Sequence, residues 1–215
     1  MGKFKNSNLM QAWLVLLLSL VFSVTLAAVH IRLAPVIEEN KTRETMKNIP
    51  ALVTGKDNNA DLKGEPLSIK QRTIRAQKKG MVKSYAVYDA FDNSGNVMGH
   101  VVKASGQGYA DKIELLIGLD ATASTITGLF ILDQKETPGL GNKIIEDTWR
   151  NQFKGKSSYA PLVAKKGKSV SENEIDAVSG ATISSRSVTE IINIAIGDVK
   201  MDIALIPESY NMENK

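Results

Sequence analysis

The sequence predicts an α+β domain with a largely antiparallel sheet and packed helices, preceded by one N-terminal transmembrane helix. Three observations support this fold class. The chain has no charged residue between Asn6 and Val29, short apolar runs separated by turn residues follow, and an amphipathic helix begins near Ser187. Because the predicted strands come in sequence-adjacent pairs rather than alternating with helices, this order favours an antiparallel sheet over a doubly wound parallel one.

The stretch Leu9–Val29 is apolar enough to cross a membrane. Its roughly 21 residues match the number that spans a hydrocarbon core as a helix. A cleaved signal peptide is the alternative, because Lys3 and Lys5 form a basic start, but the apolar run exceeds the usual signal core. Charge counting on the two sides does not decide the orientation. We expect an N-terminal tail (1–8), a transmembrane helix (9–30), a juxtamembrane stalk (31–50) and a folded domain (51–215).

Two strand pairs are expected in the domain. Tyr85–Phe91 and Val97–Lys103 flank a turn where Gly95 can take the positive φ of a tight hairpin. A second pair is formed by Ile113–Leu119 and Thr125–Leu132, which are rich in β-branched residues. His100 lies inside a predicted strand, so it is expected to be a surface or a packed histidine rather than a ligand.

Helices and loops complete the expected layout. The stalk helix covers Val36–Met46 and ends near Pro50, and a second helix covers Lys143–Phe153, with Trp149 as a packing residue. The last helix carries a capping box at Ser187–Glu190. Residues 58–66 and 155–167 are expected to be loops, and the basic run Lys70–Lys79 is expected to be a solvated face.

Composition excludes several classes of function. The 215 residues include no cysteine, which removes disulfides, thiolate nucleophiles, cysteine-ligated zinc and iron–sulfur clusters. With only two histidines, the composition also argues against a histidine-rich metal site or a bis-histidine haem. The net charge of +4 is spread along the chain, so nucleic acid is not an expected partner. The sequence lacks the G-x-S-x-G nucleophile elbow that would indicate a serine hydrolase. Any redox role therefore needs an organic cofactor.

A turn of small and hydroxyl residues precedes the last helix. Free N–H groups at a helix start favour an anion such as a phosphate, and small residues allow the backbone to approach it. The alternative is that the hydroxyls only cap the helix. The residues concerned are Asp176, Ser179, Gly180, Ala181, Thr182, Ser184 and Ser185.

The segment Asp176–Thr182 reads D-A-V-S-G-A-T and resembles the flavinylation motif of the FMN-binding domain family. The resemblance implies that a flavin transferase, using FAD as donor, esterifies Thr182 to the phosphate of FMN, and that Asp176 is the acidic residue of the motif. About forty residues earlier, E-T-P-G-L-G resembles a second segment of this family, and Gly106–Tyr109 resembles its glycine–tyrosine element. Further candidate FMN contacts are Glu136, Thr137, Gly139, Leu140 and Gly141.

The whole layout resembles the G subunits of Rnf-type electron-transport complexes, which are homologous to the C subunits of sodium-translocating NADH:quinone reductases. The resemblance implies an FMN-carrying electron relay, without complete activity alone, in a translocase that couples electron transfer between ferredoxin and NAD to Na⁺ or H⁺ movement. It also implies a place in the cytoplasmic (inner) membrane with an extracytoplasmic domain. The implied partners are integral membrane subunits, a flavin transferase and lipid. The two alternatives are a C-type subunit of a sodium-translocating NADH:quinone reductase and a non-redox membrane-anchored extracytoplasmic scaffold.

Overall fold

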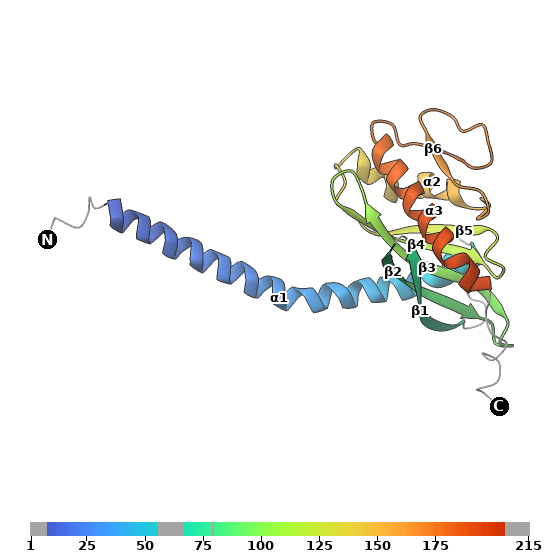
Figure 1. Cartoon of the computed structure of the whole chain (residues 1–215), viewed down its shortest axis with the longest axis horizontal. Coiled ribbons are helices and arrows are strands. Elements are labelled where there is room, and N and C mark those ends of the chain that lie inside the picture. Colours follow the sequence, from blue (N-terminus) through green and yellow to red (C-terminus); the bar gives the residue numbers. More distant parts are fainter. Residues whose placement is uncertain (1–7, 56–66, 79, 205–215) are drawn as a thin grey trace. The chain divides into compact units, whose positions relative to one another are not determined.

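The computed structural model describes residues 8–55, 67–78 and 80–204 (Figure 1). It divides the chain into two units, Met1–Glu44 and Thr45–Lys215. The fold class expected from the sequence is confirmed, because a long apolar helix is followed by a five-stranded antiparallel sheet with packed helices. The expected loop 58–66 lies outside the described residues.

The first helix, α1, runs without interruption over Asn8–Thr54. Within the described residues it is the one helix long and apolar enough to cross a membrane, and its most apolar stretch is not buried by any part of the structure. The expectation that a separate helix ends near Pro50 is wrong. The helix continues because Ile49, Leu52 and Val53 are buried against the domain. It ends before Gly55, whose φ of 66° is the left-handed conformation that commonly terminates helices.

The main sheet has the order β1-β2-β3-β4-β5, with every neighbouring pair antiparallel. The two predicted strand pairs are confirmed, and Gly95 has a φ of 83° in the first hairpin. The strands are β1 (Ser68–Lys78), β2 (Met81–Phe91), β3 (Val97–Gln107), β4 (Lys112–Asp120) and β5 (Ile126–Asp133).

Strand β1 corrects the interpretation of the basic run Lys70–Lys79 as only a solvated face. Residues 70–78 of the run belong to an edge strand whose side chains are mostly exposed, while Ile74 is buried. Charged side chains are common on edge strands, where they discourage pairing with other chains. The strand could not be predicted from the sequence, because its many charged residues leave little alternation between apolar and polar side chains.

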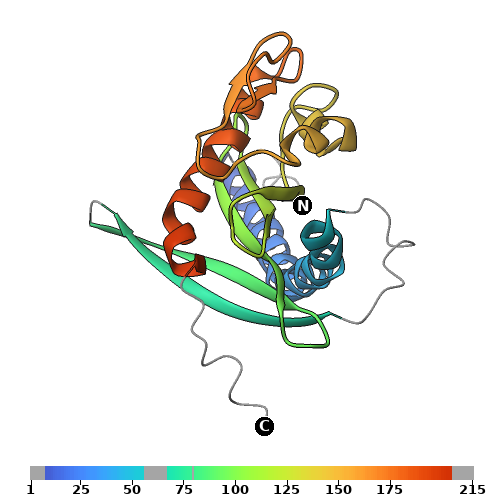
Figure 2. The same ribbon diagram turned by 90° about the vertical axis from the view of Figure 1, so that its right-hand side faces the viewer.

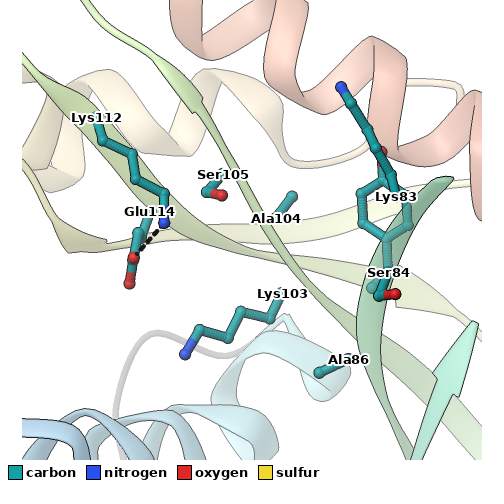
Figure 3. A pocket seen from close by; sticks show the side chains of 9 residues that line it. Lys83, Ser84, Ala86, Lys103, Ala104, Ser105, Lys112 and Glu114 are labelled. Atoms are coloured by element: carbon teal, nitrogen blue, oxygen red, sulfur yellow. Dashed lines mark hydrogen bonds and ion pairs between the residues drawn. The ribbon is translucent and has the colours of Figure 1, made fainter. Parts of the chain in front are cut away.

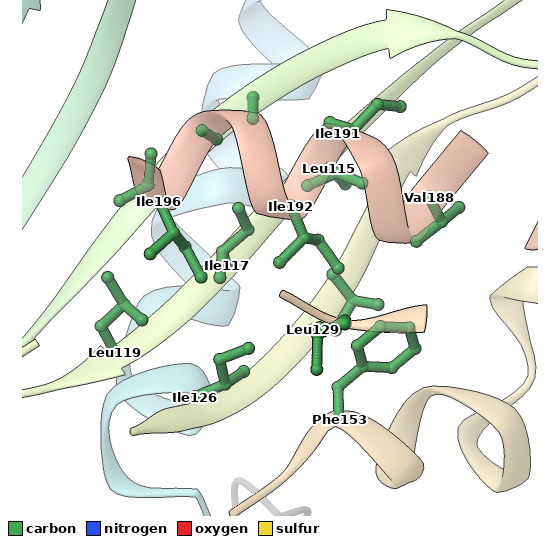
Figure 4. Packing of buried hydrophobic residues seen from close by; sticks show 14 of the residues in the cluster. Leu115, Ile117, Leu119, Ile126, Leu129, Phe153, Val188, Ile191, Ile192 and Ile196 are labelled. Atoms are coloured by element: carbon green, nitrogen blue, oxygen red, sulfur yellow. The ribbon is translucent and has the colours of Figure 1, made fainter. Parts of the chain in front are cut away.

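Two apolar layers cover the two faces of the sheet. Helix α3 (Thr182–Ala204) packs on one face, where Val188, Ile192 and Ile196 lie over buried β4 residues such as Leu115 and Ile117 (Figure 4). The last turns of α1 cover the other face. There, Thr127 Oγ1 donates a 2.5 Å hydrogen bond to the carbonyl of Leu52. The core therefore lies on both sides of the sheet.

The helix expected over Lys143–Phe153 forms as three short pieces. These are η1 (Gly141–Ile145), α2 (Asp147–Arg150) and η2 (Asn151–Phe153), and the first break falls at Glu146, whose backbone is extended. The packing role of Trp149 is confirmed, since it is 6% exposed and meets Phe153 edge to face at 5.1 Å between centroids. Its indole N–H donates to the carbonyl of Asp176 at 2.8 Å.

Two further expectations are corrected in the C-terminal part. The segment expected to be a loop contains β6 (Val163–Lys165), which pairs in parallel with β7 (Glu174–Asp176). Strands of three residues carry too little alternation to be recognised in a sequence. Helix α3 begins at Thr182, five residues before the expected capping box, because the hydroxyls of Ser184 and Ser185 bond within the fold instead of interrupting the helix.

A buried polar network connects β1, β2 and β3. His100 is fully buried, as expected for a packed residue, and its Nδ1 lies 2.6 Å from Asp89 Oδ1. Arg72 Nε donates to Asp89 Oδ2 at 2.7 Å. Burial tends to raise the pKa of Asp89, but the hydrogen bonds from His100 and Arg72 outweigh it and hold the pKa below its usual value.

The depressed pKa gives a prediction for Asp89→Asn. An acid whose pKa is lower in the folded state adds stability above its unfolded pKa of about 4, and this stability is lost as pH falls through the folded pKa. We expect the variant to lose about 3 kcal/mol of unfolding free energy at pH 7. Urea unfolding should show this difference shrinking below about pH 4, whereas the exposed Asp202→Asn should match the wild type; a difference independent of pH would contradict the prediction.

Candidate functional site

The two sequence motifs meet at one pocket of about 540 Å³. The glycine–tyrosine turn after β3 and the loop after β6 also reach it, so four segments distant in sequence line the same space. The lining residues are Tyr109, Thr137, Leu140, Gly141, Lys166, Gly180, Ala181, Thr182, Ile183 and Ser184.

Thr182 is the first residue of α3 and is half-buried at this pocket. Its hydroxyl makes no hydrogen bond to any other residue that the structure describes. The first N–H groups of a helix have no acceptor within the helix, and the helix dipole adds partial positive charge at this end. The start of α3 therefore offers both an unengaged hydroxyl and an environment that favours an anion.

Ser184 and Ser185 serve the fold instead. Ser184 is 3% exposed and donates a 2.5 Å hydrogen bond to Glu136 Oε2. Ser185 is fully buried, donates to the carbonyl of Ala181 and accepts from the amide of Val178. These bonds shape the turn that presents Thr182, whereas Ser179 is exposed beside it.

Glu136 joins three of the four segments. It is 4% exposed, and besides accepting from Ser184 it accepts from the amide of Ala110 at 3.2 Å through Oε1. Its carboxylate thus connects its own loop to the glycine–tyrosine turn and to the first turn of α3. Glu136 does not line the pocket, so its place is behind the pocket wall.

Two glycines allow Glu136 to sit in this position. A Cβ on Gly108 would overlap Glu136 Oε1, and one on Gly141 would lie 2.8 Å from both Glu136 Cβ and Ser184 Oγ. Both positions are far inside normal van der Waals contact. The residues at 108 and 141 therefore have to be glycine for the segments to close around the carboxylate.

Gly141→Ala tests this close packing. The added methyl group has to displace Glu136 or Ser184, and overpacking of this kind costs about 1–3 kcal/mol. We expect a lower melting temperature and a lower flavin content in the purified chain. Gly197→Ala is the matched control, because a Cβ there meets nothing within 4 Å in α3 and alanine favours the helix by roughly 0.5–1 kcal/mol. Equal melting temperatures for the two variants would contradict the packing argument.

The turn before α3 contacts the E-T-P-G-L-G loop directly. Gly180 has a φ of 79°, and a Cβ there would lie 2.9 Å from Leu140 Cδ2. Leu140 is nevertheless 45% exposed, and Gly139 has a φ of 75°. Leu140 therefore lies over the turn with one apolar side still accessible at the pocket.

Asp176 lies behind the pocket rather than in its lining. Its carboxylate accepts from the amide of Ser169, and its backbone N–H donates to Gln152 Oε1 at 2.7 Å. The acidic residue thus anchors the start of the turn to the loop that follows β6. Its observed contacts are those of a positioning group.

Sequence reasoning missed Lys166 and Ile183 and named Tyr109 only as part of a motif. Lys166 follows β6 in the basic stretch 165–168, which carried no chemical signature by itself. Glu174 stabilises the loop between β6 and β7, because its carboxylate accepts hydrogen bonds from Lys165 and from the amides of Val170 and Ser171. The hydrogen bond from Lys165, with those amides, lowers the pKa of Glu174 to about 2. Lys166 itself adds a positively charged side chain to the lining of the 540 Å³ pocket.

Comparison with known proteins finds a family that resembles the part of the chain around this pocket. Residues 108–197 match the model of the FMN-binding domain. The match includes the glycine–tyrosine turn, the loop of Glu136 and the turn before α3.

Part of the chain is similar in sequence to G subunits of ion-translocating complexes, the relatives that its motifs resemble. It is 38% identical over 125 residues to the G subunit of the Na⁺-translocating ferredoxin:NAD⁺ oxidoreductase complex of Acetobacterium woodii, covering 56% of this chain and 59% of that one. It is 38% identical over 109 residues to the G subunit of the ion-translocating oxidoreductase complex of Methanosarcina acetivorans, covering 51% and 55%. The chain thus spans less than two thirds of either relative.

Among solved structures, the crystal structure of Shewanella oneidensis NqrC is similar in fold. The TM-score is 0.50 at 26% sequence identity, covering 74% of this chain and 79% of that one. Both kinds of relative expected from the motifs are therefore found.

Proposed function

We propose that the chain is an electron-carrying subunit with FMN attached through its phosphate to Thr182. The observation that carries this proposal is the Thr182 hydroxyl, which makes no hydrogen bond to another described residue and lines a pocket that both family motifs reach. The homology to G subunits supports a place in a complex that couples electron transfer between ferredoxin and NAD to Na⁺ or H⁺ translocation.

The residues of the pocket fit an FMN group. Leu140, Ile183 and Tyr109 offer partly exposed apolar surface for a flat ring. Gly180 and Gly141 bring backbone close to the same space, and Thr137 and Lys166 supply a hydroxyl and a cation. When bound, FMN supplies the electron chemistry, while this chain orients it and controls its access to water.

The attachment needs only the Thr182 hydroxyl from this chain. Its oxygen bonds to the phosphorus of the FMN half of FAD, the pyrophosphate bond breaks, AMP leaves and the hydroxyl proton is released. A flavin transferase supplies the active site for this step. The exposed neighbours Ser179 and Gly180 leave the turn accessible to that enzyme. The hydrogen bond from the amide of Ser169 to the Asp176 carboxylate fixes the start of the turn.

The apolar part of α1 supports a single membrane crossing. We propose that the domain lies on the extracytoplasmic side of the cytoplasmic membrane, where a covalent bond prevents loss of FMN. Integral subunits and lipid are the partners of the apolar helix, whose side chains from Met10 to Ile37 are largely exposed.

A C-type subunit of a sodium-translocating NADH:quinone reductase is the second candidate. The similarity to NqrC in fold is the observation that favours it. Both candidates share the FMN at Thr182 and differ in the subunits that surround it.

The test is to express the full chain with an active flavin transferase and measure its intact mass. The proposal expects an increase of one FMN less one water, and flavin fluorescence that remains on the denatured protein in a gel. An unmodified mass would overturn it. Mild detergent extraction from native membranes then separates the two candidates, because ferredoxin-linked subunits support the first and quinone-reductase subunits the second.

A further inference from the structure

The main sheet opens into a fork between β2 and β3. Strand β2 pairs with β1 along its whole length, and β3 pairs with β4 from Gly99 to Gln107. The pairing between β2 and β3, however, stops at Ala86 and Lys103. In the part of the chain that the structure describes, residues 81–85 of β2 and 104–107 of β3 therefore each have a strand neighbour on one side only. We call this opening the β2–β3 fork.

Helix α3 covers one face of the β2–β3 fork and holds its two arms. The Tyr85 hydroxyl, on β2, donates to Asp198 Oδ2 at 2.7 Å, and a Cβ on Gly106, on β3, would lie 2.5 Å from Ile191 Cγ1. Both arms are thus packed against the same helix, which lies between them in Figure 2. These contacts with α3 hold the two strands apart, because pairing residues 81–85 with residues 104–107 would require α3 to move.

The opposite face of the fork is an open pocket of about 430 Å³ (Figure 3). Small side chains line the two arms there: Ser84 and Ala86 on β2, and Ala104 and Ser105 on β3. Small side chains leave the strand backbones accessible. Unpaired N–H and C=O groups along such an edge are a template for an added strand.

The charges at the β2–β3 fork favour an acidic occupant. Lys83, Lys103 and Lys112 line the open pocket together with one acid, Glu114, which accepts from Lys112 at 2.8 Å. Lys83 and Lys103 make no ion pair with any residue that the structure describes. Figure 3 shows Lys83 and Lys103 pointing in opposite directions from the fork. The smaller pocket on the α3 side is lined by Lys83 and Glu190, whose charges balance, so the open face carries the stronger positive charge.

We propose that the β2–β3 fork binds an extended, acidic segment of a partner polypeptide by strand addition. Successive side chains of an extended strand point to opposite faces, so its acidic groups can reach Lys83 and Lys103 from one backbone. Main-chain hydrogen bonds supply affinity and the lysines select the charge. This surface lies on residues outside the flavin pocket and adds a docking site to the proposed electron carrier. The edge lysines would otherwise serve only to discourage strand pairing.

A peptide titration tests strand addition and charge together. The probes are a fluorescein-labelled peptide TEEVEET, which carries glutamates on both faces of an extended strand, its basic counterpart TKKVKKT and a TEEVEET peptide N-methylated at alternate amides, each added to the full chain in detergent. The proposal expects TEEVEET to bind at least tenfold more tightly than either of the other two. Lys103→Glu should weaken it tenfold, and the exposed control Lys168→Glu should not. Equal binding of the N-methylated peptide, or no effect of Lys103→Glu, would overturn the proposal.

Photo-crosslinking identifies the occupant in native membranes. A benzoylphenylalanine at Ser84, an exposed position, is activated and the crosslinked peptide is sequenced by mass spectrometry. An acidic segment of another subunit supports the proposal. Lipid, a second copy of this chain, residues 205–215 of the same chain, or no product distinct from a control at Thr148 would refute it. Flavin content, measured on the same sample, tests the proposed electron carrier separately.

Discussion

Thr182→Ala is expected to abolish covalent flavin while leaving the fold intact. The variant lacks the oxygen that bonds to the FMN phosphorus, so the intact mass should stay unmodified and the gel band should be dark. The hydroxyl makes no hydrogen bond to another described residue, and its loss should change the free energy of unfolding by no more than about 0.5 kcal/mol. The measurements are intact mass, in-gel fluorescence and urea unfolding.

Two variants control this experiment. Thr182→Ser keeps a nucleophilic hydroxyl and should retain flavin, and Ser187→Ala removes a hydroxyl from the same helix outside the flavin pocket and should be fully modified. A flavin adduct that persists in Thr182→Ala would move the attachment to another hydroxyl, with exposed Ser179 the nearest in the turn. That result would contradict the assignment.

The motif residues were predicted through their resemblance to the FMN-binding domain family, since the hydroxyls before α3 could by themselves only cap the helix. The structure brings Thr137, Leu140, Gly180 and Thr182 to one pocket. The four apolar strands were also predictable, because Ile113–Leu119 and its neighbours are buried and rich in β-branched residues.

The missed features depend on contacts between distant segments. The sequence does not indicate that the Glu136 carboxylate turns inward to Ser184 and Ala110 rather than toward a cofactor. It likewise conceals β1, because Arg72 is a charged residue whose partner, Asp89, belongs to the next strand. Lys166 lines the pocket because it directly follows β6, which pairs with β7 over three residues. So short a pairing leaves no recognisable pattern in the sequence.

Glu136 was expected to contact the cofactor, and the structure favours a different contribution. Its two carboxylate oxygens are engaged with Ser184 and Ala110, so it fixes the relative positions of the segments that line the pocket. We therefore treat Glu136 as a positioning residue.

Glu136→Ala should lower both stability and flavin loading. The change leaves the buried Ser184 hydroxyl without its acceptor, which costs about 1–3 kcal/mol, whereas Ala110 is exposed and its amide can bond to water. We expect the free energy of unfolding to fall by roughly 1–3 kcal/mol and flavin incorporation to fall several-fold at equal transferase. The exposed Glu146→Ala is the control and should match the wild type. Urea unfolding and in-gel fluorescence measure the two effects.

A double-mutant cycle with Ser184→Ala separates positioning from general loss of packing. If the 2.5 Å hydrogen bond between Ser184 and Glu136 links α3 to the loop, the double variant should lose less stability than the sum of the single variants, with a coupling of about 1–3 kcal/mol. The absorbance spectrum of the residual bound flavin should also shift in each single variant, because the walls of its pocket move. Additive stabilities together with an unchanged spectrum would show that Glu136 does not hold the flavin pocket in place.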